Sequence, residues 1–581
     1  MLTHEEREEI EAELSHYPNK QAVCIDAMLI VQKHRGWVSD EALNDIGEVL
    51  CMSTTDLDGI ATFYNLIRRK PVGKHVAMIC DSVSCWIMGY EQLRDHVCTR
   101  LEIPMGSTTP DGRVTLLPIV CLGACDRAPA MLIDGELHTD LDQQRVDEVL
   151  AQCVLTGTME RPLTKNLRPD GETVLLADYA RAGGYEGLRK ALTISPSEVS
   201  ELVKRSNLRG RGGAGFPTAM KWSFVPMGKD APHPKYLVAN ADEMEPGTFK
   251  DRILMEGDPH QFIEGMIIAA YAIEADIGYI FLRGEYKKSA ERLTSALAEA
   301  REQNYLGKNI LGSEYSFEIY LHVSAGRYIC GEETALLNAL EGKRAHPRTK
   351  PPFPQISGLW GKPTIVQNVE TLCNLPHIVA NGPEWFLGLS KSEDGGTKLF
   401  GASGKVKRPG LWELPLGTTM REILEEHAGG MRDGLRFRGA LPGGASTDFL
   451  VEEHLDVPMD YTSVQKAGSR LGTGTMVVLD DKTCPVGMVW NLEHFFAQES
   501  CGWCTPCWSG LAWTEKILYA MEQGRAEAHD LETLKFQTKF LAPGNTFCAF
   551  APGAVEPLQS ALKYFGDDFN RHIAEKRCPW R

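Results

Sequence analysis

A run of cysteines near the C-terminus carries the clearest chemical signal in the chain. Cys501, Cys504 and Cys507 follow a C-x2-C-x2-C spacing, and Cys548 stands alone about forty residues further on. Three thiolates this close can bind one compact metal centre, and a fourth from a distant segment completes the ligand set of a [4Fe-4S] cluster. The pattern therefore predicts a protein that transfers single electrons.

A second group of four cysteines lies much nearer the N-terminus. Cys80 and Cys85 have a C-x4-C spacing, and Cys121 and Cys125 have a C-x3-C spacing. Each pair follows an apolar stretch that is expected to form a strand. Zinc ribbons usually use C-x2-C pairs, so these wider spacings favour a [2Fe-2S] cluster. A structural zinc ion and buried unliganded thiols are the alternatives.

The segment Gly210–Gly215 formally contains the G-x-G-x-x-G pattern of dinucleotide-binding loops. Such a loop must follow a strand, but the preceding residues 195–204 predict a capped helix. This is therefore not a standard dinucleotide loop. Its bare amides could still bind a phosphate, with Lys221 as a countercharge, whereas a simple tight turn is the alternative.

Polar residues follow the predicted strand 236–239. They are Asn240, Asp242, Glu243 and Glu245. Ligands of α/β proteins bind at the carboxyl ends of strands, so these side chains could contact a ribityl chain, a flavin ring, a ribose or a divalent metal. The residues alone do not choose among these ligands, and a solvated turn also explains them.

Three further segments could contact a ligand. The first contains Gly331, Glu332 and Glu333 after Tyr328, the second contains Lys350 and Phe353 between prolines, and the third contains Asn368 and Thr371 at a helix start. In the second segment the aromatic ring could stack on adenine, and a packed corner is the alternative. In the third segment the polar residues are explained by helix capping.

Length and composition limit the class of protein. A chain of 581 residues is too long for one core, and roughly three to five domains are expected. The net charge of −17, with no basic tract, argues against a nucleic-acid partner. The acidic start does not resemble a secretory signal, and no apolar stretch is long enough to span a bilayer. The 16 cysteines are therefore expected to be reduced thiols or metal ligands.

The pattern of elements predicts a multidomain fold of α/β and α parts. We expect strands at 75–80, 114–121, 130–133, 236–239 and 278–282, and helices at 142–154, 290–302 and 419–428. The expected segments are N-terminal helices (1–72), a small α/β domain (73–155), a linker (156–171), a larger α/β domain (172–390), a glycine-rich β domain (395–480) and a C-terminal helical domain (481–581).

Several of these motifs, in this order, resemble the E and F subunits of bacterial respiratory complex I. Residues 1–155 are similar to the E subunit, and the remainder is similar to the flavin-bearing F subunit, so the chain resembles an E–F fusion. The segments that carry the likeness to F are 208–222, 240–245, 328–335, 350–354, 357–363 and 500–507. The resemblance implies a thioredoxin-like [2Fe-2S] domain, a Rossmann-like FMN domain, a β-grasp-like (SLBB) domain and a helical bundle with a [4Fe-4S] cluster.

The resemblance also implies roles for single residues. Glu245 and Glu333 would line the NADH pocket as catalytic residues, and Phe353 would stack on adenine with Lys350 near the nucleotide. The cluster ligands would be Cys80, Cys85, Cys121 and Cys125 for [2Fe-2S], and Cys501, Cys504, Cys507 and Cys548 for [4Fe-4S]. The other cofactor-binding residues would be Gly210, Arg211, Gly212, Gly213, Gly215, Lys221, Asn240, Asp242, Glu243, Tyr328, Gly331, Glu332, Asn368 and Thr371.

The implied activity is NADH:quinone oxidoreductase. NADH would deliver a hydride to FMN, and single electrons would leave through the [4Fe-4S] cluster to the iron–sulfur G subunit and the rest of the complex, with [2Fe-2S] as a side acceptor. The protein would be cytoplasmic and peripheral on the inner membrane, without direct insertion. Gln367, Trp508 and Arg327 depart from the residues expected at their positions.

Two other functions fit parts of the pattern. The diaphorase subunit of a soluble NAD-linked hydrogenase or formate dehydrogenase also joins the same two halves. A scaffold that binds zinc at both four-cysteine sites is the alternative outside enzyme chemistry. Iron, flavin and acid-labile sulfide would separate the electron-transfer functions from the scaffold.

Overall fold

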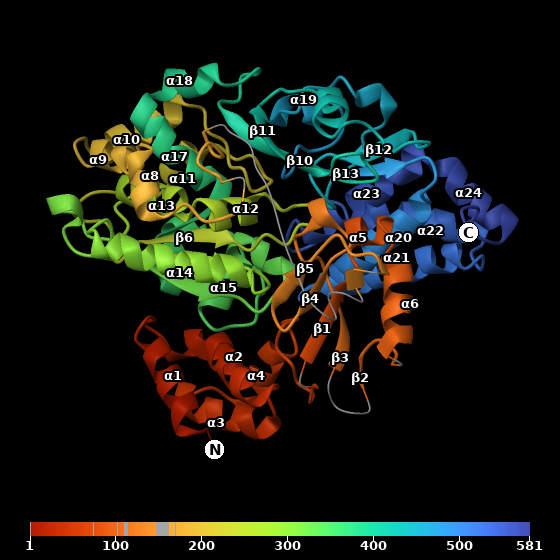
Figure 1. Ribbon diagram of the computed structural model, residues 1–581, viewed down its shortest axis with the longest axis horizontal. Helices are drawn as coiled ribbons and strands as arrows, with labels where there is room; N and C mark the ends of the chain where they lie inside the picture. The colour runs from red at the N-terminus through yellow and green to blue at the C-terminus, as the bar shows by residue number, and fades with distance from the viewer. Residues whose placement is uncertain are drawn as a thin grey trace.

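The structure is a computed structural model that describes residues 2–73, 75–101, 103–109, 114–143, 145–146, 162–168 and 170–581. Within these ranges the chain forms a helical N-terminal segment, three β-sheets and a helical C-terminal domain (Figure 1). The predicted combination of α/β domains with helical ends is confirmed. The predicted linker and the helix expected at 142–154 lie partly or mainly outside the described residues.

The N-terminal helical segment packs against the middle of the chain. Its first helix begins with the predicted capping box, in which the Glu6 N–H donates to Thr3 Oγ1 at 3.2 Å and the Thr3 N–H donates to Glu6 Oε2 at 2.7 Å. Tyr17 Oη lies 2.8 Å from His322 Nδ1 in the central domain. The helices are α1 (His4–Leu14), η1 (Lys20–Val23), α2 (Cys24–Arg35), α3 (Asp40–Leu50) and α4 (Thr54–Ala61).

The first sheet domain has the strand order β2-β3-β1-β4-β5, and β1 runs parallel to β3. The predicted strands at 75–80, 114–121 and 130–133 are confirmed to within two residues. Cys80 ends β1 and Cys121 follows β3, so the parallel pairing brings the two cysteine loops to one edge of the sheet. The elements are β1 (His75–Cys80), α5 (Val83–Ile87), α6 (Tyr90–Leu101), β2 (Ser107–Thr108), β3 (Val114–Ile119), η2 (Cys125–Arg127), β4 (Met131–Ile133) and β5 (Glu136–His138).

The second sheet domain contains a fully parallel sheet of order β8-β7-β6-β9. Asn240 at the end of β6 is the register partner of Asn368 at the end of β9, so two predicted polar segments meet at one edge. The strands are β6 (Tyr236–Ala241), β7 (Ile277–Leu282), β8 (Glu318–Val323) and β9 (Thr364–Asn368).

Helices surround this parallel sheet. The glycine loop follows helix α10, which has a capping box at Ser195 and Glu198, so the prediction of a helix before the loop is confirmed. The helices are α8 (Leu176–Arg181), α9 (Glu186–Ala191), α10 (Pro196–Arg205), α11 (Thr218–Trp222), α12 (Lys250–Gly257), α13 (Pro259–Ala272), α14 (Lys287–Glu302), η3 (Ile310–Gly312), η4 (Tyr328–Gly331), α15 (Glu333–Leu340), α16 (Pro354–Ser357), η5 (Leu359–Gly361), α17 (Val369–Asn381) and α18 (Pro383–Gly388).

The third sheet domain has the strand order β11-β10-β13-β12. The helix predicted at 419–428 is shorter and spans Glu422–His427. It is a π-helix, in which each hydrogen bond joins residues five positions apart. The elements are β10 (Thr397–Gly404), β11 (Gly410–Pro415), η6 (Glu422–His427), β12 (Phe437–Leu441), η7 (Glu452–His454), α19 (Tyr461–Lys466) and β13 (Thr475–Asp480).

The C-terminal helical domain begins with a hairpin of two helices that pack against each other. The turn between them carries Cys501 and Cys504, and Cys507 lies in the first turn of the second helix. Among the described residues, no helix is both long and apolar enough to cross a bilayer. The helices are α20 (Pro485–Glu499), α21 (Thr505–Glu522), α22 (Ala528–Phe540), α23 (Phe550–Tyr564) and α24 (Gly566–Glu575).

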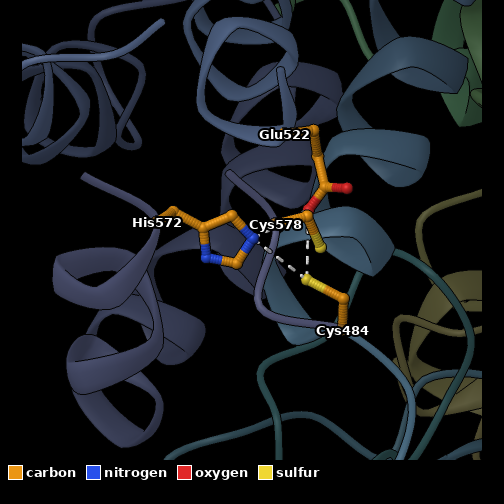
Figure 2. A group of neighbouring side chains, drawn as sticks. All are labelled: Cys484, Glu522, His572 and Cys578. Atoms are coloured by element: carbon orange, nitrogen blue, oxygen red, sulfur yellow. Dashed lines mark hydrogen bonds and ion pairs between the residues drawn. The ribbon is translucent and has the colours of Figure 1, made fainter. Parts of the chain in front are cut away.

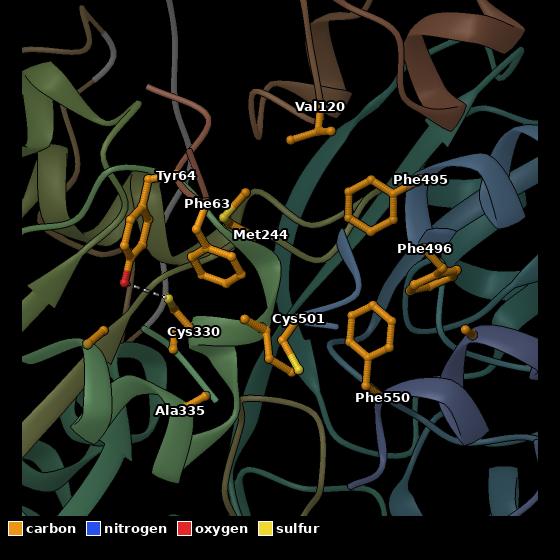
Figure 3. Close-up of a cluster of buried hydrophobic side chains, with 14 of the residues drawn as sticks. Phe63, Tyr64, Val120, Met244, Cys330, Ala335, Phe495, Phe496, Cys501 and Phe550 are labelled. Atoms are coloured by element: carbon orange, nitrogen blue, oxygen red, sulfur yellow. Dashed lines mark hydrogen bonds between the residues drawn. The ribbon is translucent and has the colours of Figure 1, made fainter. Parts of the chain in front are cut away.

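One buried apolar cluster joins the N-terminal segment, the second sheet domain and the C-terminal domain (Figure 3). It contains Phe63 and Tyr64 from the N-terminal segment, Cys330 after β8, and Cys501 with Phe550 from the C-terminal domain. Burial of apolar area is the main favourable term in such packing. The cysteine turn of the C-terminal domain is thus held against the domain that contains the glycine loop.

Candidate functional site

The glycine loop is fixed by hydrogen bonds to residues that are far away in sequence. Tyr461 Oη donates to the Gly210 carbonyl at 2.8 Å, and the Arg211 N–H donates to Thr371 Oγ1 at 2.8 Å. Gly215 has φ +63°, and a Cβ there would lie 2.4 Å from the Tyr461 ring, so the position requires glycine. In the described structure nothing lies within 4 Å of a Cβ added at Gly213, which leaves this part of the loop open to a ligand.

The Arg211 side chain does not point to the open side of the loop. Its guanidinium is fully buried and donates to the carbonyls of Gly395 at 2.7 Å and Thr397 at 3.1 Å. It therefore fixes the loop to the start of the third sheet domain. Its backbone N–H also donates to Thr371 Oγ1, so Arg211 holds the loop in place instead of offering a free donor to the predicted phosphate site.

Two polar side chains at the carboxyl edge of the parallel sheet are buried without partners. Both carboxylate oxygens of Asp242 and the Oε1 atom of Gln367 have no hydrogen-bond partner among the described residues. Burial raises the pKa of the Asp242 carboxyl well above its usual value. Asn240 donates to the Gly331 carbonyl at 3.0 Å and so links β6 to η4. These unpaired polar atoms could hydrogen-bond the polar groups of a flavin.

Glu243 is used by the fold itself. Its carboxylate accepts the N–H groups of Asp251 at 2.8 Å and Arg252 at 3.1 Å at the start of α12, and the Tyr286 hydroxyl at 3.0 Å. Burial, with the neighbouring Asp251, raises the pKa of Glu243 to about 7. Both oxygens are therefore occupied, unlike those of Asp242.

Glu245 joins two domains at the mouth of the site. The Tyr328 hydroxyl donates to Glu245 Oε2 at 2.6 Å, and the Ser446 N–H from the third sheet domain donates to Oε1 at 2.6 Å. Burial raises the pKa of Glu245 despite these donors. A carboxyl with a raised pKa where two domains meet is a candidate functional group.

Glu333 lies between two lysines. Lys221 Nζ is 2.7 Å from Glu333 Oε2, and Lys350 Nζ is 3.0 Å from Glu333 Oε1. Burial alone would raise the pKa of Glu333, but the two ammonium groups hold it below its usual value. Lys350 also contacts Glu332 Oε1 at 3.1 Å, while the other Glu332 oxygen caps α15. The predicted phosphate-binding and nucleotide-binding cations thus meet at one carboxylate.

Phe353 and Gly331 lie on the open side of this group. The Phe353 side chain is 53% exposed, which leaves a face of the ring for stacking. In the described structure a Cβ at Gly331 would meet nothing within 4 Å. These positions agree with a nucleotide at the edge of the sheet.

Asn368 and Thr371 do cap a helix, as the alternative interpretation expected. The Thr371 N–H donates to Asn368 Oδ1 at 3.3 Å, and Asn368 Nδ2 donates to Asp251 Oδ2 at 2.7 Å. Sequence reasoning missed the buried ion group behind this cap. Its members are Glu370, Lys250 and Lys398. Glu370 Oε2 lies 2.9 Å from Lys250 Nζ and 3.0 Å from Lys398 Nζ.

The first four cysteines meet at the edge of the first sheet, and all four are buried. The neighbouring Cys121 and Cys85 thiols raise the pKa of Cys80 well above its usual value, and the Sγ atoms of Cys121 and Cys125 are 3.6 Å apart. The Gly247 N–H, from the second sheet domain, donates to Cys125 Sγ at 3.2 Å. Gly247 follows Glu245 by two residues, so this cysteine group touches the loop that carries the candidate NADH-pocket residue.

The second four cysteines also meet. Burial, with the neighbouring Cys504, Cys548 and Cys501, raises the pKa of the Cys507 thiol to about 12. Cys548 comes just before α23, and Arg344 Nη2 donates to the Cys501 carbonyl at 3.3 Å. Cys504 and Cys548 are only partly buried, unlike the cysteines of the first group.

Arg327, one of the departures from the expected pattern, links domains. It donates to Asn65 Oδ1 at 3.3 Å, lies 3.4 Å from Glu499 Oε1, and stands over the Phe63 ring at 4.8 Å from the ring centre. These contacts tie the N-terminal segment to the end of α20, beside the cysteine turn. The position thus supports domain packing.

Neither cysteine group has the compactness of a single-ion site. Within the described ranges, the one group of three or more His, Cys, Asp or Glu ligand atoms that all lie within 4.8 Å of one another is elsewhere, at Cys484. Four thiolates around one zinc ion lie about 3.8 Å apart, because the Zn–S distance is about 2.3 Å. The 3.6 Å between Cys121 Sγ and Cys125 Sγ fits two ligands of one metal atom, and a [2Fe-2S] cluster takes two thiolates on each iron.

Four family matches cover most of the chain. Residues 10–154 match the thioredoxin-like [2Fe-2S] ferredoxin family, and residues 203–377 match the Nuo51 FMN-binding domain. Residues 401–449 match the SLBB domain, and residues 487–572 match the iron–sulfur binding region of NADH-ubiquinone oxidoreductase F. The predicted fold classes and the predicted cofactors FMN, [2Fe-2S] and [4Fe-4S] are thereby confirmed at the level of domains.

Solved structures and curated proteins agree with these matches. The chain is similar to a NAD⁺-reducing [NiFe]-hydrogenase chain in the H₂-reduced state, with a TM-score of 0.82 and 30% identity over 96% of this chain and 94% of that chain. It is 60% identical to the F subunits of the NADH-quinone oxidoreductases of Escherichia coli (strain K12) and Salmonella typhimurium, over 71% of this chain and 93% of theirs. The chain therefore belongs to the family of NADH-quinone oxidoreductase F subunits, with a thioredoxin-like [2Fe-2S] domain joined before it.

Proposed function

We propose that this chain is the NADH-oxidising, electron-input module of a respiratory NADH:quinone oxidoreductase. The observation that carries the proposal is the position of the Asn240–Glu245 segment. It ends β6, an inner strand of the parallel sheet, and holds a buried carboxyl that has no hydrogen-bond partner in the described part of the chain. It continues into Gly247, which donates to a cysteine of the first group. The 60% identity to the E. coli protein supports the same function.

The residues at the sheet edge fit FMN. The open glycine loop would hold its phosphate through backbone N–H groups, and Asn240, Asp242 and Gln367 would meet its polar ring and chain atoms. FMN, when bound, accepts electrons in pairs and releases them one at a time. The chain itself supplies the binding surface and no acid–base pair is required for hydride transfer.

NADH would bind on the open side of the same edge. Phe353 offers a ring for stacking, and Lys350 offers a cation to the pyrophosphate after releasing part of its pairing with Glu332 and Glu333. Glu245 is held in place by Tyr328 and Ser446, so its carboxyl is fixed before the substrate arrives. Such preorganised groups orient a substrate with little entropic cost on binding.

Electrons would leave through the second cysteine group. It borders the surface, and its neighbours include aromatic side chains with unusually high exposure: Trp503 at 56% and Trp508 at 61%. The ring centres of Trp503 and Phe547 are 6.2 Å apart. Phe536 stacks on Phe540, a few residues before Cys548 in the sequence. Exposed aromatic patches of this kind mark protein interfaces.

The partner at this surface would be the iron–sulfur G subunit of the complex, and through it the peripheral and membrane arms. The module would then be cytoplasmic and peripheral on the inner membrane. The first cysteine group would act as a side acceptor, because its buried position offers no comparable exit.

A second candidate is the diaphorase subunit of a soluble NAD-linked hydrogenase or formate dehydrogenase. The observation that favours it is the hydrogenase chain that matches both halves of this protein over 96% of its length. The lower identity of 30%, against 60% for the F subunits, makes this the weaker candidate.

The test is an anaerobic NADH titration of the purified protein, followed by visible and EPR spectroscopy. We expect flavin bleaching together with reduction of a [4Fe-4S] signal. Affinity purification of the tagged chain from its own cells then separates the two enzymes: co-purifying complex I proteins support the proposal, whereas a co-purifying hydrogenase or formate dehydrogenase supports the second candidate. Zinc without flavin would exclude both.

A further inference from the structure

Four metal-binding side chains meet at the end of the C-terminal hairpin that lies away from the cysteine turn (Figure 2). Cys484 precedes α20, Glu522 is the last residue of α21, His572 lies in α24, and Cys578 follows α24. None of them belongs to the eight predicted cluster ligands. At the level of sequence, Cys484 and Cys578 had no paired spacing to mark them.

The four ligand atoms form one tight group. All lie within 4.8 Å of one another, and all four residues are buried. Glu522 Oε1 is 3.0 Å from Cys484 Sγ and 3.1 Å from His572 Nε2, and Cys484 Sγ is 3.4 Å from His572 Nε2. The donor atoms thus converge on one point from the ends of α20 and α21, from α24 and from the residues after it.

The surroundings orient the donors toward that point. His572 Nδ1 lies 2.7 Å from the Asp568 carbonyl, which fixes the proton on Nδ1 and leaves the Nε2 lone pair facing the group. The Gly487 N–H donates to Cys484 Sγ at 3.2 Å, so the Cys484 side chain caps α20 and its sulfur is held in place. The His572 ring stacks on Trp580 with ring centres 5.9 Å apart.

One atom of the group is left unsatisfied. Glu522 Oε2 is buried and finds no hydrogen-bond donor within the described part of the chain, although Arg581 Nη2 stands 3.7 Å away. Substitution of Gly487 would also crowd the site, because a Cβ there would lie 3.2 Å from the Glu522 carboxylate. This buried carboxylate oxygen is therefore available to a cation.

We propose that Cys484, Glu522, His572 and Cys578 bind one Zn²⁺ ion in a closed tetrahedral site. Two sulfurs, one imidazole nitrogen and one carboxylate oxygen are all ordinary zinc ligands, and four protein ligands with no open position are typical of a structural site. Two thiolates and a carboxylate carry three negative charges, which Zn²⁺ and the nearby Arg581 balance. The site is separate from both electron-transfer clusters.

The location gives the ion a mechanical role. Helices α20 and α21 form a hairpin with the Cys501–Cys507 turn at one end and this group at the other. With about 1.5 Å per residue, the 15 residues of α20 separate the two by roughly 22 Å. The ion would fasten the open end of the hairpin to the segment after α24, and so hold the helices that carry the cluster turn.

The decisive experiment is elemental analysis of the purified, cluster-loaded protein. We expect about one zinc per chain beside the six irons of one [2Fe-2S] and one [4Fe-4S] cluster. Zinc X-ray absorption should show about two sulfurs near 2.3 Å and about two nitrogen or oxygen ligands near 2.0 Å. In C484S and C578S the zinc should fall at least about tenfold while iron stays unchanged. C373S, which alters a buried cysteine outside these sites, should keep both metals.

Three outcomes would overturn the proposal. The first is parent protein that contains its iron but no zinc. This measurement needs no variant, so it tests the proposal even if the variants fail to fold. The second is zinc bound by more than two sulfurs, which would place it in a cluster site. The third is a Cys484–Cys578 disulfide, detected by mass spectrometry of the unreduced protein.

Discussion

The two cluster sites use the same residue type in different surroundings. Cys80, Cys85, Cys121 and Cys125 are all buried between the first and second sheet domains. In the second group Cys504 and Cys548 are partly exposed, and Trp503 and Trp508 beside them face solvent. Under the proposed function, the buried site would act as a store, and the site beside exposed aromatic side chains would pass electrons to another protein.

The largest expected effect separates the two sites directly. C504A should lower quinone reduction by the assembled complex at least about 100-fold, because it removes the exit; this corresponds to about 2.7 kcal/mol of barrier. C85A should lower it less than about threefold, because it removes only the side acceptor. EPR must show that each variant keeps the other cluster. Equal losses in both variants would contradict the distinction.

Glu245 tests whether one entry point feeds both sites. E245Q removes the carboxylate that Tyr328 and Ser446 hold at the mouth of the pocket. We expect NADH to reduce both clusters about tenfold more slowly in stopped-flow measurements, with FMN still bound. E291Q, on the exposed face of α14, is the matched control. An unchanged rate would remove Glu245 from the site.

Trp508 tests the exit surface. W508A should weaken binding of the iron–sulfur G subunit about tenfold, because exposed aromatic anchors dominate interfaces. Ferricyanide reduction by NADH should stay unchanged, since the flavin site is not altered. L175A, at a side chain that is 51% exposed on the second sheet domain, should leave partner affinity unchanged. Equal affinity of W508A and the parent chain would place the interface elsewhere.

The smallest effect concerns pH and the buried site. Glu243, with a pKa raised to about 7 mainly by burial, contacts Tyr286, which packs against Gly123 in the cysteine loop. Deprotonation adds negative charge near the cluster and disfavours its reduction. The [2Fe-2S] potential should therefore fall between pH 6 and 8, by at most about 59 mV per pH unit.

EPR redox titration checks this pH effect in the parent chain and in E243Q. The variant keeps a side chain that can accept hydrogen bonds but cannot ionise, so its [2Fe-2S] potential should be flat over this range. The [4Fe-4S] potential should change less, because Glu243 contacts Tyr286, which lies against the loop of the first cysteine group. Equal pH-dependent shifts in the potentials of both clusters would show that Glu243 does not act selectively on the [2Fe-2S] cluster.

Much of the local structure was predictable from the sequence. The Thr3–Glu6 capping box, the strand that ends at Cys80 and the helix before the glycine loop all appear as expected. Each depends on residues within a few positions of one another. Within the described residues, the helix expected at 419–428 differs from its prediction, because its backbone is wound as a π-helix over Glu422–His427.

The contacts that complete the site were not predictable. Tyr461 and Ser446 reach the glycine loop and Glu245 from the third sheet domain, about 200 or more residues away in sequence. Asp242 and Glu243 are neighbours with similar side chains, yet the first is unpartnered and the second caps α12. No local pattern separates them, because the difference depends on what packs above the strand end.

The sequence by itself determined the chemistry: cysteine spacing and the ordered motifs specified two clusters and a flavin domain, since ligand spacing is a local property. The tertiary structure alone decided how these parts are related. It placed Gly247 on Cys125, exposed Trp508 beside Cys507, and gathered Cys484, Glu522, His572 and Cys578 at one point. Such contacts join segments that are remote in the chain, and only the packing of whole domains brings them together.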